Sequence, residues 1–208
     1  MASGQNTPQD AAYWYVPVSR AVIAAVLAVI ITFSADHSPV LGSLVFGGFA
    51  VVSGLVGGVT GGRALERGVE RSAFLAQAII TIVAGVVALA FPRAGLGFLL
   101  FLISAWAVVA GFLELYAGLR SRRRHAASRD WIFVGALTVA LAVAVLIVPP
   151  NLSEQFTGPD GVQRVLNASV VVVGALGAYG AIVAVYLIIA GLSLKWAPTA
   201  ATQDGIAS

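Results

Sequence analysis

The stretch WAVVAGFLELYAGLR, residues 106–120, decides the fold because the stretch FAVVSGLVGGVTGGR, residues 49–63, repeats its pattern. The two stretches lie 57 residues apart and are identical at six of their fifteen positions. Three further pairs share this spacing: Phe74 and Trp131, Thr81 and Thr138, and Pro92 and Pro149. A third unit has sixteen additional residues in its outer loop, after which IAGL at 189–192 corresponds to YAGL at 116–119. The repeat predicts three similar structural units in tandem.

Composition identifies the environment of these units. The chain has 208 residues, of which 59% are hydrophobic and 10% are charged, against about 25% charged in ordinary soluble proteins. A hydrocarbon core requires about 20 apolar residues per helix. Six runs approach or exceed that length: Val16–Phe33, Val40–Thr60, Ala73–Phe91, Gly97–Gly118, Trp131–Val148 and Leu166–Leu194. The fold class is therefore all-α, a polytopic membrane protein with six transmembrane helices.

The three units are predicted to be helical hairpins, over residues 16–72, 73–130 and 131–195 of a membrane domain that spans 16–195. Each hairpin enters from one side and returns to it, so the three share one orientation, unlike inverted transporter repeats. Pro92 and the Pro149–Pro150 pair each end a helix, because proline blocks helix continuation.

Charge distribution predicts the orientation. Ten Lys and Arg residues, counting Arg20, fall on the side of the termini, and only Arg93 and Arg164 fall on the other. By the positive-inside rule, both termini are cytoplasmic, with tails at 1–15 and 196–208. The tyrosines and tryptophans near these helix ends, including Tyr13 and Trp131, are expected at the headgroup level. A cleaved signal peptide is the alternative interpretation of the first run, but Phe33 stands where cleavage requires a small residue.

The basic loop after the fourth run contains Arg120, Arg122, Arg123 and Arg124. Its simplest interpretation is a topology determinant, and attraction to anionic cytoplasmic lipids would accompany it. Nucleic-acid binding is not expected of a short loop held between two membrane spans.

The units resemble the HdeD-like family of bacterial inner-membrane proteins. The resemblance rests on the three hairpins, on a first helix closed by proline (GVVALAFPRAG, 85–95) and on the aromatic–glycine second helix at 106–120. It is strongest over 73–148, weaker over 40–72, and weakest after 150. It implies six spans in the bacterial plasma membrane and a link to acid or envelope stress, and it supplies no catalytic residues.

Groups that carry catalysis are scarce, so the sequence predicts no enzyme, no cofactor and no metal site. There is no cysteine, and His37 and His125 lie on opposite sides of the predicted membrane. The chain has no HExxH, GxSxG or GxxxxGK[ST] motif.

Glu114 is the one acidic residue well inside a predicted span, and the sequence places no basic residue beside it. Ionisable groups in a membrane usually have a function or a route to the surface. Gln77 lies at a similar depth in the antiparallel third run, so a Glu114–Gln77 hydrogen bond is expected. Two interpretations remain: a structural Glu that is hydrogen-bonded or snorkels to the interface, and a site for a ligand, a proton or a partner.

Glycines mark the second run. Gly54, Gly58 and Gly62 recur every four residues, and Gly111 corresponds to Gly54 in the next unit. Small residues on one face let two helix backbones approach closely. The favoured interpretation is packing within the chain, and the alternative is a homo-oligomer or a contact with another membrane protein.

Three hypotheses about function follow. The first is a non-enzymatic membrane protein of envelope or acid-stress tolerance, acting through packing and partner contacts. The second is a small transporter or channel with Glu114 in its path. The third is an accessory subunit of a larger membrane complex.

Overall fold

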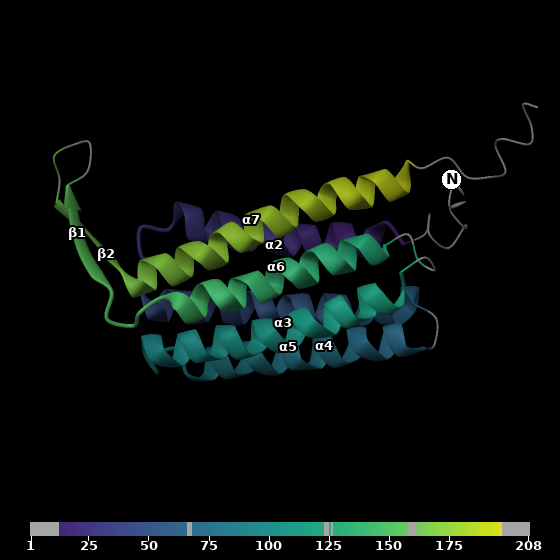
Figure 1. Cartoon of the computed structure of the whole chain (residues 1–208), viewed down its shortest axis with the longest axis horizontal. Helices are drawn as coiled ribbons and strands as arrows, with labels where there is room; N and C mark the ends of the chain where they lie inside the picture. Colours follow the sequence, from purple (N-terminus) through teal and green to yellow (C-terminus); the bar gives the residue numbers. More distant parts are fainter. Residues whose placement is uncertain are drawn as a thin grey trace, which may run out of the picture.

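The computed structural model describes residues 13–65, 68–122, 125, 127–157, 161 and 163–196. Within these ranges it contains six long helices and one pair of short strands (Figure 1). The elements are α2 (Tyr15–Phe33), α3 (Pro39–Ala64), α4 (Val69–Ala90), α5 (Leu96–Arg120), α6 (Ser128–Ile147), β1 (Ser153–Thr157), β2 (Gln163–Asn167) and α7 (Ala168–Lys195). All six helices are long and apolar enough to cross a membrane, which confirms the prediction of six spans.

The helix ends follow local sequence signals. α3 begins with Pro39 in its first turn, and the Ser38 hydroxyl before it accepts a hydrogen bond from the Leu41 amide at 3.2 Å. α7 begins after Asn167, whose side chain accepts from the Val170 amide at 3.0 Å. The turn between α4 and α5 requires Gly95, whose φ of 90° is costly for any residue with a Cβ.

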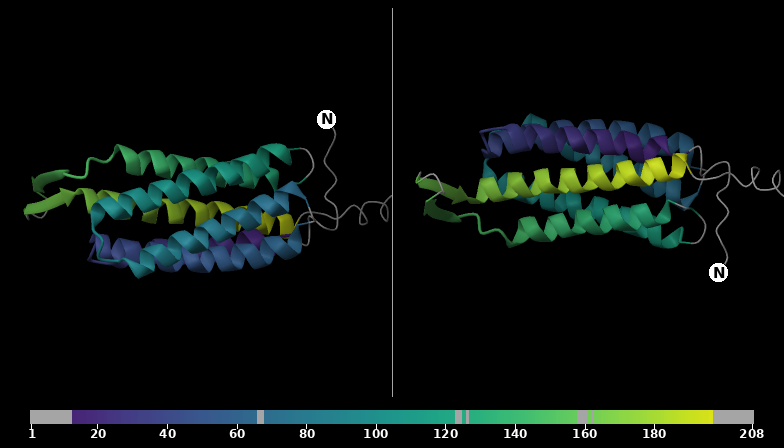
Figure 2. Two further views of the ribbon diagram at one scale, coloured as in Figure 1. Left: turned by 90° about the horizontal axis from the view of Figure 1, so that it is seen from below. Right: turned by 90° about the horizontal axis from the view of Figure 1, so that it is seen from above.

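The helices run along one long axis (Figures 1 and 2). α2 begins and α7 ends at the same end of the bundle, here named the terminal end, and the β1–β2 hairpin projects from the opposite end. The most extensive contacts join α3 to α4, α5 to α6, and α7 back to α2. Within each predicted hairpin the two helices also touch, but less extensively. Each predicted unit therefore packs its second helix against the first helix of the next unit, and the third unit closes the ring on the first.

Glycines permit these close helix pairs. A Cβ at Gly54 would lie 2.5 Å from Ile82 Cγ1 and 2.8 Å from the Ala78 carbonyl oxygen of α4. One at Gly111 would lie 3.0 Å from the Gly135 carbonyl oxygen of α6. Only hydrogen fits at such distances, so the backbones can approach only where glycine stands.

The other two predicted packing glycines face the same neighbour. A Cβ at Gly58 would lie 3.3 Å from Ala78 Cβ, and one at Gly62 would lie 3.5 Å from Leu75 Cδ2. The glycine face of α3 is thus directed at α4 within the chain.

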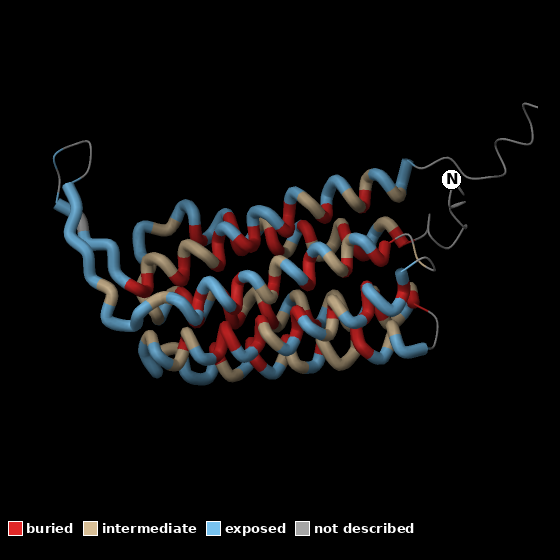
Figure 3. Tube along the Cα trace, viewed as in Figure 1, coloured by how far each residue is buried: buried red, intermediate tan, exposed pale blue. Residues whose placement is uncertain are grey.

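Buried residues line the interior of the bundle, and large apolar residues cover its outside (Figure 3). Ile79, Phe101 and Leu146 are each more than 60% exposed, as a protein in lipid requires. A second buried cluster at the terminal end includes Tyr13, Phe74 and Trp131. Tyr13 and Trp131 lie near the ends of α2 and α6, where the sequence predicted them, but they are buried in the bundle, with 8% and 2% of their surfaces exposed.

The outer segment between α6 and α7 is not an irregular loop. Its β1 and β2 pair antiparallel, with Phe156 opposite Arg164 and Ser153 opposite Asn167. All of β1 is exposed, and Phe156 and Val165 are about half exposed. The all-α membrane domain therefore carries a small β-hairpin outside the bundle.

Candidate functional site

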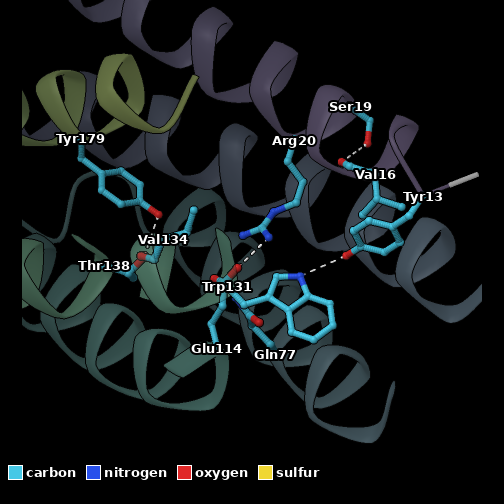
Figure 4. A network of polar contacts seen from close by, with 10 residues as sticks. All are labelled: Tyr13, Val16, Ser19, Arg20, Gln77, Glu114, Trp131, Val134, Thr138 and Tyr179. Carbon is cyan, nitrogen blue, oxygen red and sulfur yellow. Dashed lines mark hydrogen bonds and ion pairs between the residues drawn. The ribbon is translucent and has the colours of Figure 1, made fainter. Parts of the chain in front are cut away.

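Glu114 is the centre of a buried polar cluster. Its side chain projects from α5 into the bundle and is 1% exposed. Arg20 Nη1 of α2 donates to Glu114 Oε1 at 2.6 Å, and Gln77 Nε2 of α4 donates to Oε2 at 3.0 Å (Figure 4). We call Arg20, Gln77 and Glu114 the polar triad. The structure contains the Glu114–Gln77 hydrogen bond that the sequence predicted.

The expectation that no basic residue accompanies Glu114 is wrong. Arg20 was counted among the charges of the terminal end, but it is the sixth residue of α2 and pairs with Glu114. The repeat contained the signal, because Arg20 stands 57 residues before Gln77, at the corresponding position of the first unit. Two first-helix side chains from successive units therefore meet one carboxylate.

This pairing also excludes a snorkelling glutamate. Both Glu114 oxygens accept hydrogen bonds from inside the bundle. An unpaired buried carboxylate would cost several kcal/mol, whereas the guanidinium of Arg20 cancels its charge at contact distance. The triad joins three helices, α2, α4 and α5, and is locally neutral.

An aromatic layer lies beside the triad, on the side toward the β-hairpin end of the bundle. Trp106 Nε1 donates to Thr81 Oγ1 at 3.1 Å, and the hydroxyls of Tyr179 and Thr138 lie 3.0 Å apart. Trp106 and Tyr179 occupy corresponding positions in the second and third units, as do Thr81 and Thr138. In the first unit these two positions are Phe49 and Ala24, which carry no hydrogen-bonding group. The second and third units thus each pair a hydrogen-bonding aromatic residue with a threonine, whereas the first unit has neither group at these positions.

On the other side of the triad, the terminal-end cluster closes the bundle. Trp131 Nε1 donates to the Tyr13 hydroxyl at 3.1 Å, and the rings of Trp131 and Phe74 lie 4.9 Å apart. Burial raises the pKa of the Tyr13 phenol, so this hydroxyl is uncharged at neutral pH. We call Tyr13, Phe74 and Trp131 the aromatic plug.

A cavity of about 60 Å³ lies between the plug and the aromatic layer. That is enough space for water molecules or part of a small solute. Arg20, Gln77 and Glu114 all line it, together with Phe49, Ser53 and Gly57 of α3. Twelve of its seventeen lining residues are buried, and the five that are partly exposed are Arg20, Phe49, Ser53, Gly57 and Gln77.

The other predicted site residues lie apart from the cavity or outside the described ranges. Arg120 and Arg122 are exposed at the terminal end of α5. Arg123 and Arg124 lie outside the described residues. Gly54 lines the cavity, whereas Gly58, Gly62 and Gly111 do not. Within the described ranges, no three His, Asp or Glu side chains gather where they could hold a metal ion.

Comparison with known proteins found a family match for one part of the chain. A search of curated proteins and a search of solved structures each found no match. Residues 76–147 match the family described as a short repeat of unknown function (DUF308). The matched segment begins in α4, ends with α6, and includes Gln77 and Glu114 but not Arg20.

Proposed function

We propose that this multi-pass membrane protein is HdeD-like and serves envelope or acid-stress tolerance in a bacterial plasma membrane without catalysing a reaction. The observation that carries the proposal is the match of 76–147 to the short-repeat family. The six apolar helices and the matching contacts of successive units support it. In this proposal the bundle acts through its packed shape and its contacts with lipid and partner proteins.

Gene deletion tests the stress role. Cells without the gene are expected to survive low pH and membrane-disrupting detergent less well than the parent, and the wild-type gene is expected to restore survival. Unchanged survival under both stresses would contradict the role. Complementation with Glu114→Gln then shows whether the polar triad takes part.

We also propose that both termini are cytoplasmic. The basic loop at the terminal end supports this orientation, since arginine-rich loops are retained inside. The chain has no cysteine, so single-cysteine variants report topology without further changes. An impermeant maleimide added to whole cells is expected to label His37→Cys, and to label His125→Cys only after permeabilisation. The reverse pattern would invert the topology.

A transporter or channel is the second candidate, and the cavity beside Glu114 is the observation that favours it. The aromatic plug covers the terminal end of the cavity, and Arg20 neutralises Glu114, so the cavity supports a bound solute more directly than a continuous path. Flux measured in vesicles for the wild type and for Glu114→Gln distinguishes these roles. If the wild-type protein carries no flux, the transporter or channel hypothesis is wrong.

The accessory-subunit hypothesis loses its proposed surface. It depended on the glycine face of the second helix, and Gly54, Gly58 and Gly62 all face α4 inside the chain. A partner would therefore have to use another part of the apolar exterior.

A further inference from the structure

The polar triad and the cavity both arise because the three units have different residues at two corresponding positions, one in the first helix and one in the second. These positions lie at one level along the bundle axis. In the first helices, the corresponding residues are Arg20, Gln77 and Val134, and in the second helices they are Gly57, Glu114 and Leu187. In the second unit, Gln77 and Glu114 are hydrogen-bonded to each other. In the third unit, Val134 and Leu187 are both buried in the main apolar core.

The first unit has no side chain to fill this level. Gly57 replaces the larger residues of the other two units, and a Cβ placed on it would meet no atom within 4 Å. Arg20 turns away from its own unit to reach Glu114 of the next. The cavity is lined by residues from all six helices, and Arg20 and Gly57 line it on the side of α2 and α3.

The opening of this cavity is lateral. Its partly exposed lining residues lie on α2 (Arg20), α3 (Phe49, Ser53 and Gly57) and α4 (Gln77). α3 and α4 are packed closely through Gly54, so the accessible gap is the one between α2 and α3. Toward the terminal end, the buried side chains of Val16 and Phe74 line the cavity and close it. A solute therefore enters from the side of the bundle, which faces the bilayer.

The polar groups at the opening define the chemistry of that solute. Arg20 uses one N–H on Glu114, which leaves four further donors. The Gln77 side-chain oxygen and the Ser53 hydroxyl have no hydrogen-bond partner among the described residues. The site thus offers donors from Arg20 and acceptors from Gln77 and Ser53 within one small space.

Charge and size narrow the choice further. Glu114 already balances Arg20, so an anionic head would bring an unbalanced charge into a mostly buried site, which is costly. A cavity of about 60 Å³ suits a small head and the first carbons of a chain. Phe49, Phe74 and Trp106 supply apolar walls.

We propose that the gap between α2 and α3 is a lateral binding site for a single-chain lipid with a small uncharged head that both donates and accepts hydrogen bonds. A protonated long-chain carboxylic acid and a long-chain alcohol both have this chemistry. The head accepts from Arg20 and donates to the Gln77 oxygen, and the chain extends between the two helices into the bilayer. The inference is independent of the proposed stress role.

Photo-crosslinking of the full chain in phosphatidylcholine nanodiscs tests the site. The probe is palmitic acid with a diazirine near its carboxyl group, and cross-linked residues are identified by peptide mass spectrometry. Saturable cross-linking to α2 and α3 around Arg20 and Ser53 is expected. Unlabelled palmitic acid and hexadecanol should both compete, because they share the uncharged hydrogen-bonding head.

Two variants of α3 form a matched pair. Gly57→Leu copies the third unit and fills the gap, so half-saturation should require at least about tenfold more probe, a loss of about 1.4 kcal/mol. Gly48→Leu also places a side chain where no atom lies within 4 Å, but away from the cavity, so binding should not change. Ser53→Val, which copies Val183 of the third unit, is a second variant with an expected loss should Gly57→Leu not fold.

Two results would overturn the inference. Cross-linking that does not saturate, or that is equal in Gly57→Leu and Gly48→Leu, would mean contact with surrounding lipid only. Stronger competition by lysophosphatidic acid than by palmitic acid and hexadecanol would mean that the site takes an anionic phosphate head.

Discussion

The gap between α2 and α3 and the gap between α6 and α7 occupy corresponding places in the first and third predicted units, yet they are filled differently. The α6–α7 level is closed by Val134 and Leu187, which are 0% and 1% exposed. The α2–α3 level has Arg20 and Gly57, and a cavity lies between them. Corresponding positions thus form a filled apolar core in the third unit and line a polar cavity in the first.

The comparison teaches that three substitutions within a repeat are enough to create a site. Arginine introduces a charge, glycine removes the filling side chain, and Glu114 of the middle unit balances the charge across the bundle. The backbone pairing that holds the ring together does not change, because it depends on other glycines, such as Gly54 and Gly111.

The largest effect is expected from breaking the ion pair on one side. Arg20→Val leaves Glu114 buried without its cation and should lower the free energy of unfolding by about 3–5 kcal/mol. Adding Glu114→Leu copies the third unit on both sides and should recover most of the loss. Unfolding in mixed detergent micelles with increasing dodecyl sulfate measures the free energy of unfolding of both variants. Wild-type stability of Arg20→Val alone would show that the pair is not structurally important.

The next effect distinguishes the glycines that hold helices together from the glycine that leaves space. Gly54→Leu forces a side chain against Ile82 and the α4 backbone and should cost about 1–3 kcal/mol. Gly57→Leu, three residues later on the same helix, should leave the free energy of unfolding unchanged, because a Cβ at this position meets no atom within 4 Å. The same unfolding titration compares them, and equal losses in the two variants would contradict the distinction.

A smaller effect is expected in the aromatic layer. Tyr179→Phe removes the hydrogen bond to Thr138 and should cost about 0.5–1.5 kcal/mol. Adding Thr138→Ala gives the third unit the Phe–Ala pair of the first, Phe49 with Ala24. The double variant should lose less stability than the sum of the two single variants. Strict additivity would show that the two residues are not coupled.

The smallest effect is expected outside the bundle. Phe156→Ser changes an exposed side chain on a strand that is exposed along its whole length, so stability should change by less than about 0.5 kcal/mol. A larger loss in thermal unfolding would mean that the β-hairpin is packed on the membrane domain.

Much of the fold could be predicted from apolar run lengths, since only helices satisfy their own backbone groups in lipid. Pro92 and Pro149 correctly separate helices, and Gln77 was correctly paired with Glu114 from their similar depth. The β-hairpin was not predicted, because its strands are short, exposed and only weakly patterned.

Arg20 was missed for a different reason. An arginine near the start of a helix has the same local sequence pattern whether it faces headgroups or the interior, and in the structure the rotation of α2 directs Arg20 inward. The repeat spacing from Gln77 indicated the inward direction, but the carboxylate that receives Arg20 comes from another unit.

The sequence by itself determined that six apolar helices cross a membrane and that glycines recur where helices must approach closely. These properties are local, because each helix satisfies its own backbone and each glycine is small in any context. Only the tertiary structure decided that the closest pairs join successive units, that α7 closes on α2, and that Arg20 meets Glu114. Residues 94 positions apart in the chain are brought together by the closure of the ring, and no local pattern encodes that distance.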